Sequence, residues 1–192
     1  MKHQDRCKSD IRGLQETCTG QQELLGRIDD LENRTKRNNL VFWGIEETMD
    51  KTFDNSCEAL IKWLIASHMK MEEAESIEIE RAHRSGRKDS SGKPRPIHVL
   101  FLRHQQKESI LRQARRTLKD NPLKGRKVFI TDDVSHKVRK ERKELREQLT
   151  NIRNQPGVMF AFIPWSVPAR IIYKTPEGFR TIHYGDQSFQ PE

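Results

Sequence analysis

The chain changes from a helical to a strand pattern at residues 38–45, Asn38-Asn39-Leu40-Val41-Phe42-Trp43-Gly44-Ile45. β-Branched and aromatic residues dominate this run, as is typical of strands, and a turn is expected at its end. Side chains alternate between the two faces of a strand. We therefore expect Leu40 and Phe42 to face a core, and Val41 and Trp43 to face the open side of a sheet.

Helix and strand patterns alternate downstream of this run as far as residue 131. Apolar residues recur at helical spacing over Asp54–Lys70 and over Ile110–Leu118, which predicts two amphipathic helices. Short alternating or apolar runs predict three more strands, at Ile77–Ala82, Ile97–Leu102 and Val128–Ile130. The resulting order over residues 38–131 is β-α-β-β-α-β. This is the split-βαβ, ferredoxin-like plan, which the RNA recognition motif shares.

Residues 132–192 predict a second small domain made of one helix and a sheet. Asp132, Asp133 and Ser135 suit a helix start, and apolar residues between Val134 and Ile152 form one face of the helix. Strands are predicted at Val158–Ile163, Arg170–Lys174 and Phe179–Tyr184. The predicted fold class is therefore α+β, in three segments: a coiled-coil helix over residues 1–37, a domain like the RNA recognition motif over 38–131, and a C-terminal domain over 132–192 that we expect to bind nucleic acid.

Residues 1–37 are polar, and their sparse apolar residues fit a heptad repeat when Ile28 is set at position a and Leu31 at d. Arg27 and Glu32 then flank the seam at g and e. The pattern resembles the R-h-x-x-h-E signature of short parallel trimeric coiled coils, in which Arg and Glu pair across neighbouring helices. A single solvated helix is the alternative, because a helix this poor in apolar residues is marginal alone. The predicted seam residues are Leu14, Leu24, Arg27, Ile28, Leu31 and Glu32.

Positive charge is concentrated between Arg81 and Arg153. This stretch holds 22 Lys and Arg residues against 8 Asp and Glu residues, a net of +14, whereas the whole chain carries +8. Such a field is unfavourable unless a polyanion neutralises it. The first functional hypothesis is therefore binding to a phosphate backbone.

Several classes of protein are disfavoured by the sequence. No apolar run approaches the roughly 20 residues that span a bilayer, and the N-terminus lacks an apolar signal core. Three cysteines without CxxC spacing indicate neither a disulfide scaffold nor a zinc site. We therefore expect an intracellular protein with no membrane partner.

Catalytic motifs are also absent from the sequence, which has no Gly-rich phosphate loop, GxSxG elbow or HExxH helix. Asp132-Asp133 is the one close acidic pair of the basic stretch, and helix capping explains it better than metal binding. The histidines are scattered. We expect no enzyme activity, no catalytic residue, no metal, no cofactor and no small-molecule substrate.

Four ordered segments resemble the first-open-reading-frame protein of LINE-type non-LTR retrotransposons. The family shares the order of a coiled coil, a noncanonical RNA recognition motif and a small C-terminal domain, and the resemblance extends from about Gly26 to Gln187. The segments are Leu31-Glu32-Asn33-Arg34 with Arg37-Asn38-Asn39-Leu40, Arg81-Ala82-His83-Arg84, Arg95-Pro96-Ile97-His98-Val99 and Asp133-Val134-Ser135.

The resemblance implies a homotrimeric protein that binds single-stranded RNA, and also single-stranded DNA. It implies ATP-independent nucleic-acid chaperone activity, and a role in coating the element's own transcript in ribonucleoprotein particles of the cytoplasm, with the nucleus as a second location. Two alternatives stay open, a coiled-coil scaffold or protein-interaction module, and a metal-dependent nuclease or strand-transfer enzyme. RNA contact is assigned by the resemblance to Arg37, Arg81, Arg84, Arg95, Arg115, Arg116 and Arg142.

Aromatic residues give a weaker expectation of base stacking. Phe101 is the one aromatic residue of the third strand and is expected in the core, while Trp43 either stacks a base or lies under the coiled coil. The segment from Ile163 to Arg170 resembles the family's Pro-Ala-(Lys/Arg) strand entry. Trp165 and Arg170 there form either a stacking and phosphate-binding corner or, for Trp165, a plug of the small core.

Overall fold

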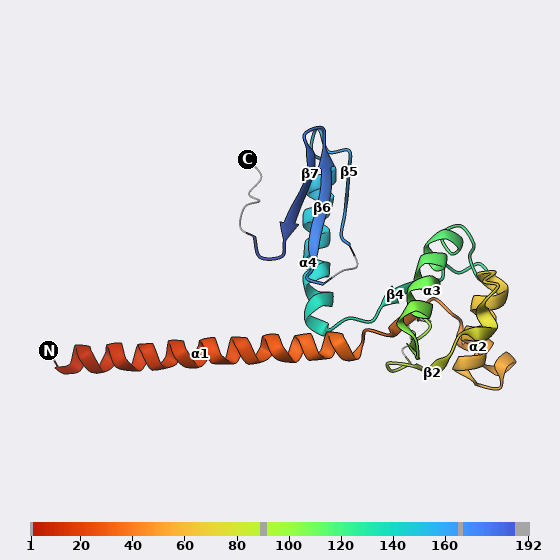
Figure 1. The fold of residues 1–192 in the computed structure, drawn as a ribbon, viewed down its shortest axis with the longest axis horizontal. Coiled ribbons are helices and arrows are strands. Elements are labelled where there is room, and N and C mark those ends of the chain that lie inside the picture. Colours follow the sequence, from red (N-terminus) through yellow and green to blue (C-terminus); the bar gives the residue numbers. More distant parts are fainter. Residues whose placement is uncertain (1, 89–91, 165–166, 187–192) are drawn as a thin grey trace. The chain divides into compact units, whose positions relative to one another are not determined.

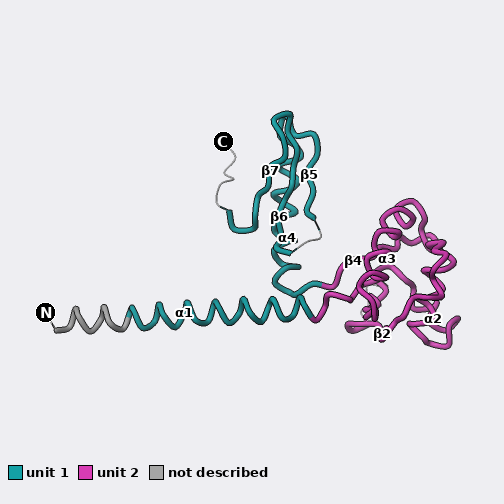
Figure 2. Tube along the Cα trace, viewed as in Figure 1, with its two compact units in different colours: residues 1–34, 134–192 teal, residues 35–133 magenta. Residues whose placement is uncertain are grey.

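The computed structural model has a mixed α+β fold, with a long N-terminal helix and antiparallel sheets (Figure 1). It describes residues 2–88, 92–164 and 167–186. The chain divides into two compact units (Figure 2). We call Thr35–Asp133 the central unit, and Met1–Arg34 together with Val134–Glu192 the terminal unit. The predicted α+β class is confirmed at this level.

The sheet of the central unit, the central sheet, has the strand order β2-β3-β1-β4 with every neighbouring pair antiparallel. The helices between its strands include α2, which continues into one π-helical turn at Leu64–His68, and α3. Short 3₁₀ turns occupy Glu47–Phe53 and Ala74–Ser76. The elements are β1 (Asn39–Trp43), α2 (Cys57–Trp63), β2 (Ile79–Arg84), β3 (Ile97–Phe101), α3 (His104–Thr117) and β4 (Phe129–Asp132).

One face of the central sheet is buried against α2 and α3. Leu40, Phe42 and Phe101 are completely buried in this core, which confirms the faces predicted for them. The helices contribute apolar residues such as Leu60 and Ile110 to the same cluster. Each large apolar side chain buried in this way stabilises the fold by about 1.5–3 kcal/mol.

In the terminal unit, a second antiparallel sheet, the terminal sheet, has the order β5-β6-β7 and packs against α4. Leu145 and Ile152 of α4 form a small core with Ala161, Ile171 and Ile182 of the strands. The predicted helix and strands are thus present. The elements of this unit are α1 (Lys2–Thr35), α4 (His136–Arg153), β5 (Phe160–Phe162), β6 (Arg170–Thr175) and β7 (Gly178–His183).

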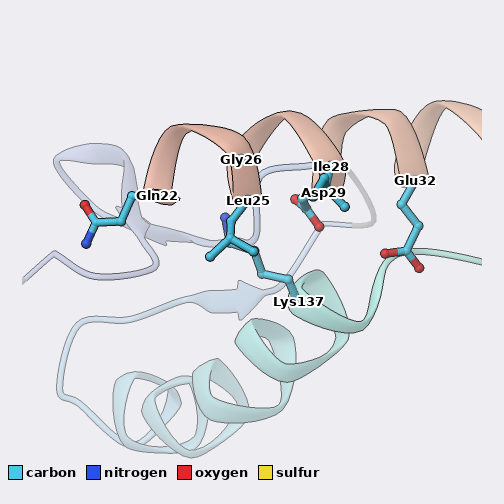
Figure 3. Close-up of a pocket in the computed structure, with 7 residues that line it drawn as sticks. All are labelled: Gln22, Leu25, Gly26, Ile28, Asp29, Glu32 and Lys137. Atoms are coloured by element: carbon cyan, nitrogen blue, oxygen red, sulfur yellow. The ribbon is translucent and has the colours of Figure 1, made fainter. Parts of the chain in front are cut away.

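Ser135 begins α4 and is held by residues of α1. Its hydroxyl accepts a hydrogen bond from the backbone N–H of Val138, as a helix N-cap does. The same hydroxyl bonds the Asp29 carboxylate, and the Ser135 N–H donates to Asn33 Oδ1 at 3.0 Å. A groove of about 430 Å³ lies beside this contact, and Lys137 extends from α4 toward Leu25 of α1 (Figure 3).

The acidic pair at residues 132–133 does not cap α4, contrary to the prediction. Asp132 forms an ion pair with the buried Lys107 of α3. Asp133 accepts a hydrogen bond from Asn39 Nδ2 at 3.2 Å and lies 3.5 Å from His98 Nδ1. Burial acts to raise the pKa of Asp133, but the hydrogen bonds from His98 and Asn39 outweigh it and hold the pKa below its ordinary value. Asp132 therefore joins β4 to α3, and Asp133 joins the end of β4 to β1 and β3.

None of the described helices combines the length and apolar character that crossing a bilayer requires.

Gly44 allows β1 to end in close contact with the chain before β4. Its φ of +83° lies in the region that side chains disfavour, and a Cβ atom at this position would stand 2.2 Å from the carbonyl oxygen of Lys127. The turn predicted after β1 therefore requires glycine for two separate reasons, backbone conformation and space.

We predict that Gly44→Ala lowers the free energy of unfolding of the central unit by about 3 kcal/mol or more, since backbone strain and a clash with a carbonyl each cost about 1–3 kcal/mol. Denaturant-induced unfolding measures the loss. Gly86→Ala is the matched control, because Gly86 has a φ of +92° with nothing within 4 Å of the added Cβ, and it should cost about 1 kcal/mol. Equal losses in the two variants would show that the close approach to Lys127 contributes nothing.

Candidate nucleic-acid interface

The face of the central sheet opposite the helices carries an aromatic pair. Val128 and Ile130 of the β4 segment are buried in the core, so the intervening Phe129 lies on the other face, where 46% of it is exposed. The β1–β4 register places Trp43 directly opposite Phe129. Their rings stack with centroids 5.8 Å apart and an interplanar angle of 8°.

The pair is held in place by neighbours on the same face. The indole Nε1 of Trp43 donates a hydrogen bond to Thr131 Oγ1 at 3.0 Å. This bond satisfies the one polar atom of the indole, while Trp43 keeps part of its surface open to solvent. Trp43 therefore lies on the face of the sheet opposite the helices, as predicted from the alternation of side chains along β1.

Basic residues flank Phe129. A groove of about 190 Å³ runs between α3 and β4, and Arg115, Lys119 and Lys127 line it together with Phe129. Its floor is apolar and includes Leu118 and Val128. We call Trp43, Phe129, Arg115, Lys119 and Lys127 the aromatic–basic patch. An aromatic surface beside several cations is the arrangement on which single-stranded nucleic acids stack and neutralise their phosphates.

Sequence reasoning placed Arg115 and Trp43 in the site but missed Phe129, Lys119 and Lys127 as its partners. The signal for Phe129 lies in the short run Val128-Phe129-Ile130, whose alternation turns the central residue away from the core. The pairing of β1 with β4, two strands far apart in sequence, was needed to bring Phe129 next to Trp43.

The other edge of the same sheet face carries Arg81 and two histidines. Arg81 is exposed on β2, and the rings of His83 and His98 stack with centroids 6.0 Å apart. Partial burial lowers the pKa of His83 from its ordinary value, and the charges of Arg81 and His98 act in the same direction. At neutral pH this edge therefore presents a neutral imidazole beside the Arg81 guanidinium.

Arg84 is bonded inside the central unit, contrary to the prediction that it contacts RNA. Its side chain is only 5% exposed. Nε and Nη2 form a bidentate pair with Asp50 at 2.7 and 2.6 Å, and the remaining donors bond the carbonyl oxygens of Ile45, Glu46 and Arg95. All five N–H groups of the guanidinium are used, so none is available for a phosphate.

Arg95 is likewise engaged inside the protein. Its Nε donates to Glu47 Oε1 at 3.0 Å and its Nη2 to Glu47 Oε2 at 3.2 Å. These hydrogen bonds lower the pKa of Glu47 to about 2. The pair fixes the loop before β3 to the 3₁₀ turn after β1, and leaves Arg95 only part of its surface for another ligand.

Two further predicted arginines are exposed in the central unit. Arg37 lies in the turn between α1 and β1, and Arg116 follows Arg115 in the last turn of α3. Neither lines the groove beside Phe129. They add positive charge to the unit without being part of the aromatic–basic patch.

The arginines predicted for the C-terminal segment belong to the terminal unit. Arg142 is only 8% exposed, which corrects its predicted place on the basic face of the helix. It lies four residues after Val138 and three before Leu145, on the buried stripe of α4. Arg170 is half-buried at the start of β6, and Trp165 lies outside the described residues.

The predicted seam residues of α1 are exposed in the single chain. Leu14, Leu24, Ile28 and Leu31 all have more than half of their surface open to solvent. Arg27 forms an ion pair with Glu23 on the same helix at 3.3 Å. Glu32 lines the groove between α1 and α4. A row of exposed apolar residues therefore runs along α1.

Within the residues that the structure describes, no group of three His, Cys, Asp or Glu side chains is arranged to hold a metal ion. No protein-family model and no curated protein matches the chain. The aromatic–basic patch and the fold that presents it are therefore the features that indicate a function.

We predict that Arg84→Ala lowers the free energy of unfolding of the central unit by about 3 kcal/mol, because it leaves the half-buried Asp50 carboxylate without its partner. Arg81→Ala is the matched control on the same strand, and this exposed position should change stability by less than about 0.5 kcal/mol. Urea unfolding of both variants decides between the roles. A fully stable Arg84→Ala protein would return Arg84 to the set of surface arginines.

Proposed function

We propose that this chain binds single-stranded RNA, and single-stranded DNA, as the RNA-coating protein of a LINE-type retrotransposon. It would act without ATP as a nucleic-acid chaperone, in ribonucleoprotein particles of the cytoplasm and, as a second location, the nucleus. The observation that carries the binding function is the aromatic–basic patch of the central unit.

The patch supplies both contributions that single-strand binding uses. Base stacking on an aromatic side chain contributes about 1–3 kcal/mol per base and tolerates any base. The stacked Trp43 and Phe129 rings offer such a surface, with Phe129 the more open of the two. Arg115, Lys119 and Lys127, which line the groove beside Phe129, would neutralise the phosphates of such a strand.

The topology of the central unit supports a ferredoxin-like fold of the RNA-recognition-motif type. The element order β1-α2-β2-β3-α3-β4 and the antiparallel strand order β2-β3-β1-β4 are those of the split-βαβ plan. RNA recognition motifs use the helix-free face of this sheet to stack bases. Trp43 and Phe129 lie on that face on β1 and β4, whereas Phe101 of β3 is buried. The proposed stacking surface therefore lies on β1 and β4, instead of on the usual pair of β1 and β3.

Membership of the retrotransposon family is supported by the ordered motifs of the sequence. The structure adds a reason for some of them. Arg84 and Arg95, which both lie in motif segments, hold β2 and the loop before β3 in place. Asp133 and Ser135, in the fourth segment, bond Asn39 and Asn33 of the first. The motif residues thus contact one another.

Self-association as a homotrimer is the second part of the proposal. The exposed row on α1 places Leu14 and Ile28 at a, and Leu24 and Leu31 at d, of one heptad register. A chaperone role follows from assembly, because several weak sites on one particle exchange along a strand while screening its phosphates.

A scaffold that binds only proteins is the competing function, and the same exposed row on α1 favours it. The two functions separate cleanly in a binding experiment, because a scaffold needs the α1 row and makes no use of the aromatic–basic patch. A nuclease or strand-transfer enzyme would instead cleave labelled nucleic acid in the presence of a divalent metal.

We predict that Arg115→Ala with Arg116→Ala weakens binding of a labelled single-stranded RNA at least tenfold, and that Phe129→Ala weakens it about fivefold or more. The logarithm of the wild-type association constant should fall linearly with the logarithm of the salt concentration. The expected slope is about −4, because about six phosphates are neutralised. Fluorescence anisotropy titrations at several salt concentrations measure both quantities.

The matched control is Lys51→Ala with Lys62→Ala, which removes the same charge from the same unit at positions outside the groove. This variant should bind within about twofold of the wild type. Equal losses in the control and in the arginine variant would mean that net charge alone drives binding. A wild-type slope shallower than about −1.5 would contradict the electrostatic account.

We predict that Ile28→Asp abolishes self-association by placing a charge in the apolar seam, while the central unit stays folded. Wild-type assembly should be weak and should strengthen with RNA, since isolated helices of this composition are marginal. Thr19→Asp, at an exposed f position of the same helix, is the charge-matched control. Sedimentation of the three proteins at high concentration, with and without RNA, tests this. A monomer mass for the wild type under all conditions would remove the trimer.

A further inference from the structure

The histidine pair of β2 and β3 lies on the helix-free face of the central sheet, outside the aromatic–basic patch. The strand register pairs His83 directly with His98, and their ring centroids are 6.0 Å apart at an interplanar angle of 25°. Ala82 packs against the core beside His83. Ile97 and Val99, on either side of His98, are buried in the same core. Because side chains alternate along a strand, both imidazoles lie opposite the helices.

The pair belongs to a row of residues that crosses the whole sheet. His98 lies opposite Val41 of β1, and Val41 lies opposite Thr131 of β4. Thr131 accepts the hydrogen bond from the Trp43 indole that holds the aromatic pair. Three strand spacings separate His83 from Thr131, a distance of about 14 Å. A strand of nucleic acid that stacks on the aromatic pair can therefore reach the histidines along one continuous surface.

The two histidines differ in what holds them. His98 Nδ1 lies 3.5 Å from the carboxylate of Asp133, whose side chain is only 6% exposed. The same carboxylate accepts a hydrogen bond from Asn39, and Lys36 Nζ lies 3.8 Å from it. The His98 ring is therefore fixed by a counter-charge inside the central unit. His83 is exposed and stacks on this fixed ring.

Arg81 stands beside His83 on the same face. The two residues are two positions apart on β2, so their side chains leave the strand about 7 Å apart. Partial burial lowers the pKa of His83 from its ordinary value of 6.5, and the charges of Arg81 and His98 act in the same direction. Glu80, the nearest acidic residue in sequence, precedes Arg81 at the irregularity of the strand pairing. These surroundings disfavour an imidazolium in the free protein, and an anion bound between His83 and Arg81 would reverse that preference.

We propose that Arg81 and His83 form a subsite for one phosphate of the bound strand, and that His83 takes up a proton when this phosphate binds. The inference deepens the proposed function and rests on it. A phosphate between the two side chains would form charge-assisted hydrogen bonds with the guanidinium and with the imidazolium. The His98 ring, held by Asp133, supports the His83 ring from behind.

Proton uptake makes binding depend on pH with a definite sign. A nearby phosphate favours the imidazolium, so the pKa of His83 is higher in the complex than in the free protein. Affinity therefore rises as the pH falls from the higher pKa to the lower one, and it is constant below both. The pKa of the free protein lies below 6.5, so we expect the rise between about pH 7.5 and 5.5. Two pKa values that differ by about one correspond to a tenfold gain in affinity.

The test measures binding of the full chain to a cyanine-labelled uridine homopolymer of about 20 nucleotides, longer than the roughly 4–16 nucleotides that a single small fold covers. Neither uracil nor the dye titrates in this pH range. At constant ionic strength, the wild type should bind about five- to tenfold tighter at the lower pH than at the higher. His83→Gln cannot take up the proton, so its affinity should change by less than about twofold.

The matched control is His104→Gln, the same substitution at the start of α3 on the helix side of the sheet. This variant should keep the pH dependence of the wild type. If His83→Gln also keeps it, while Phe129→Ala is weakened, the subsite is wrong and the proposed function stands. A wild type that fails to bind the homopolymer at every pH overturns both. Equal losses of pH dependence in the two histidine variants would overturn the inference, because the effect would not belong to His83.

A measurement on the unmodified chain is independent of how the variants fold. Imidazole NMR signals report the pKa of His83, which should be higher by about one in the complex saturated with homopolymer. Inorganic phosphate at the same phosphate concentration should leave this pKa unchanged, because a free ion lacks the stacking contacts that hold a strand on the sheet. An unchanged pKa in the complex would overturn the subsite. An equal rise with inorganic phosphate would overturn its assignment to a bound strand.

Discussion

The burial of one face of each sheet under its helices is the constraint on which the rest of the structure depends. In the central unit, Leu40 and Phe42 enter the core, so Trp43 is turned to the opposite face and meets Phe129 there. In the terminal unit, Ala161 and Ile171 face α4, and the residues between them turn outward. Because the side-chain period of a strand is two, core formation alone decides which aromatic residues are displayed. The aromatic pair of Trp43 and Phe129 is a consequence of that rule.

A chain this basic also has to divide its cations between structure and surface. Arg84 satisfies a carboxylate and three carbonyl oxygens, and Lys107 is buried against Asp132 and Glu108. Burying a cation is favourable only where partners replace the lost water, and each of these residues has such partners. Other cations, such as Lys119 and Lys127, line the groove beside Phe129. Positive charge thus serves both to join segments distant in sequence and to attract a polyanion.

The long helix α1 combines two roles that differ along its faces. Asp29 and Asn33 bond Ser135 and so hold the start of α4. The apolar residues at the a and d positions stay exposed. A helix with so few apolar residues gains little stability alone, so assembly with further copies would bury what the single chain leaves open. The contact with Ser135 would then link any assembly of α1 to the position of α4 in the same unit.

The sequence by itself determined the α+β class, the main helices and strands to within a few residues, and the buried positions Leu40, Phe42 and Phe101, because hydrophobic periodicity is a local property. It also identified Trp43 and Arg115 as candidates for the site. Only the tertiary structure decided that Arg84 and Arg142 are internal, that Asp133 bonds Asn39 and His98 while Ser135 caps α4, and that Phe129 completes the aromatic pair. The physical reason is the long separation in sequence between the residues that make these contacts. Arg84 meets Asp50 from 34 residues away, and Asn39 meets Asp133 from 94 residues away. Whether a side chain is buried, and what it contacts, depends on such distant partners, and no local sequence pattern records them.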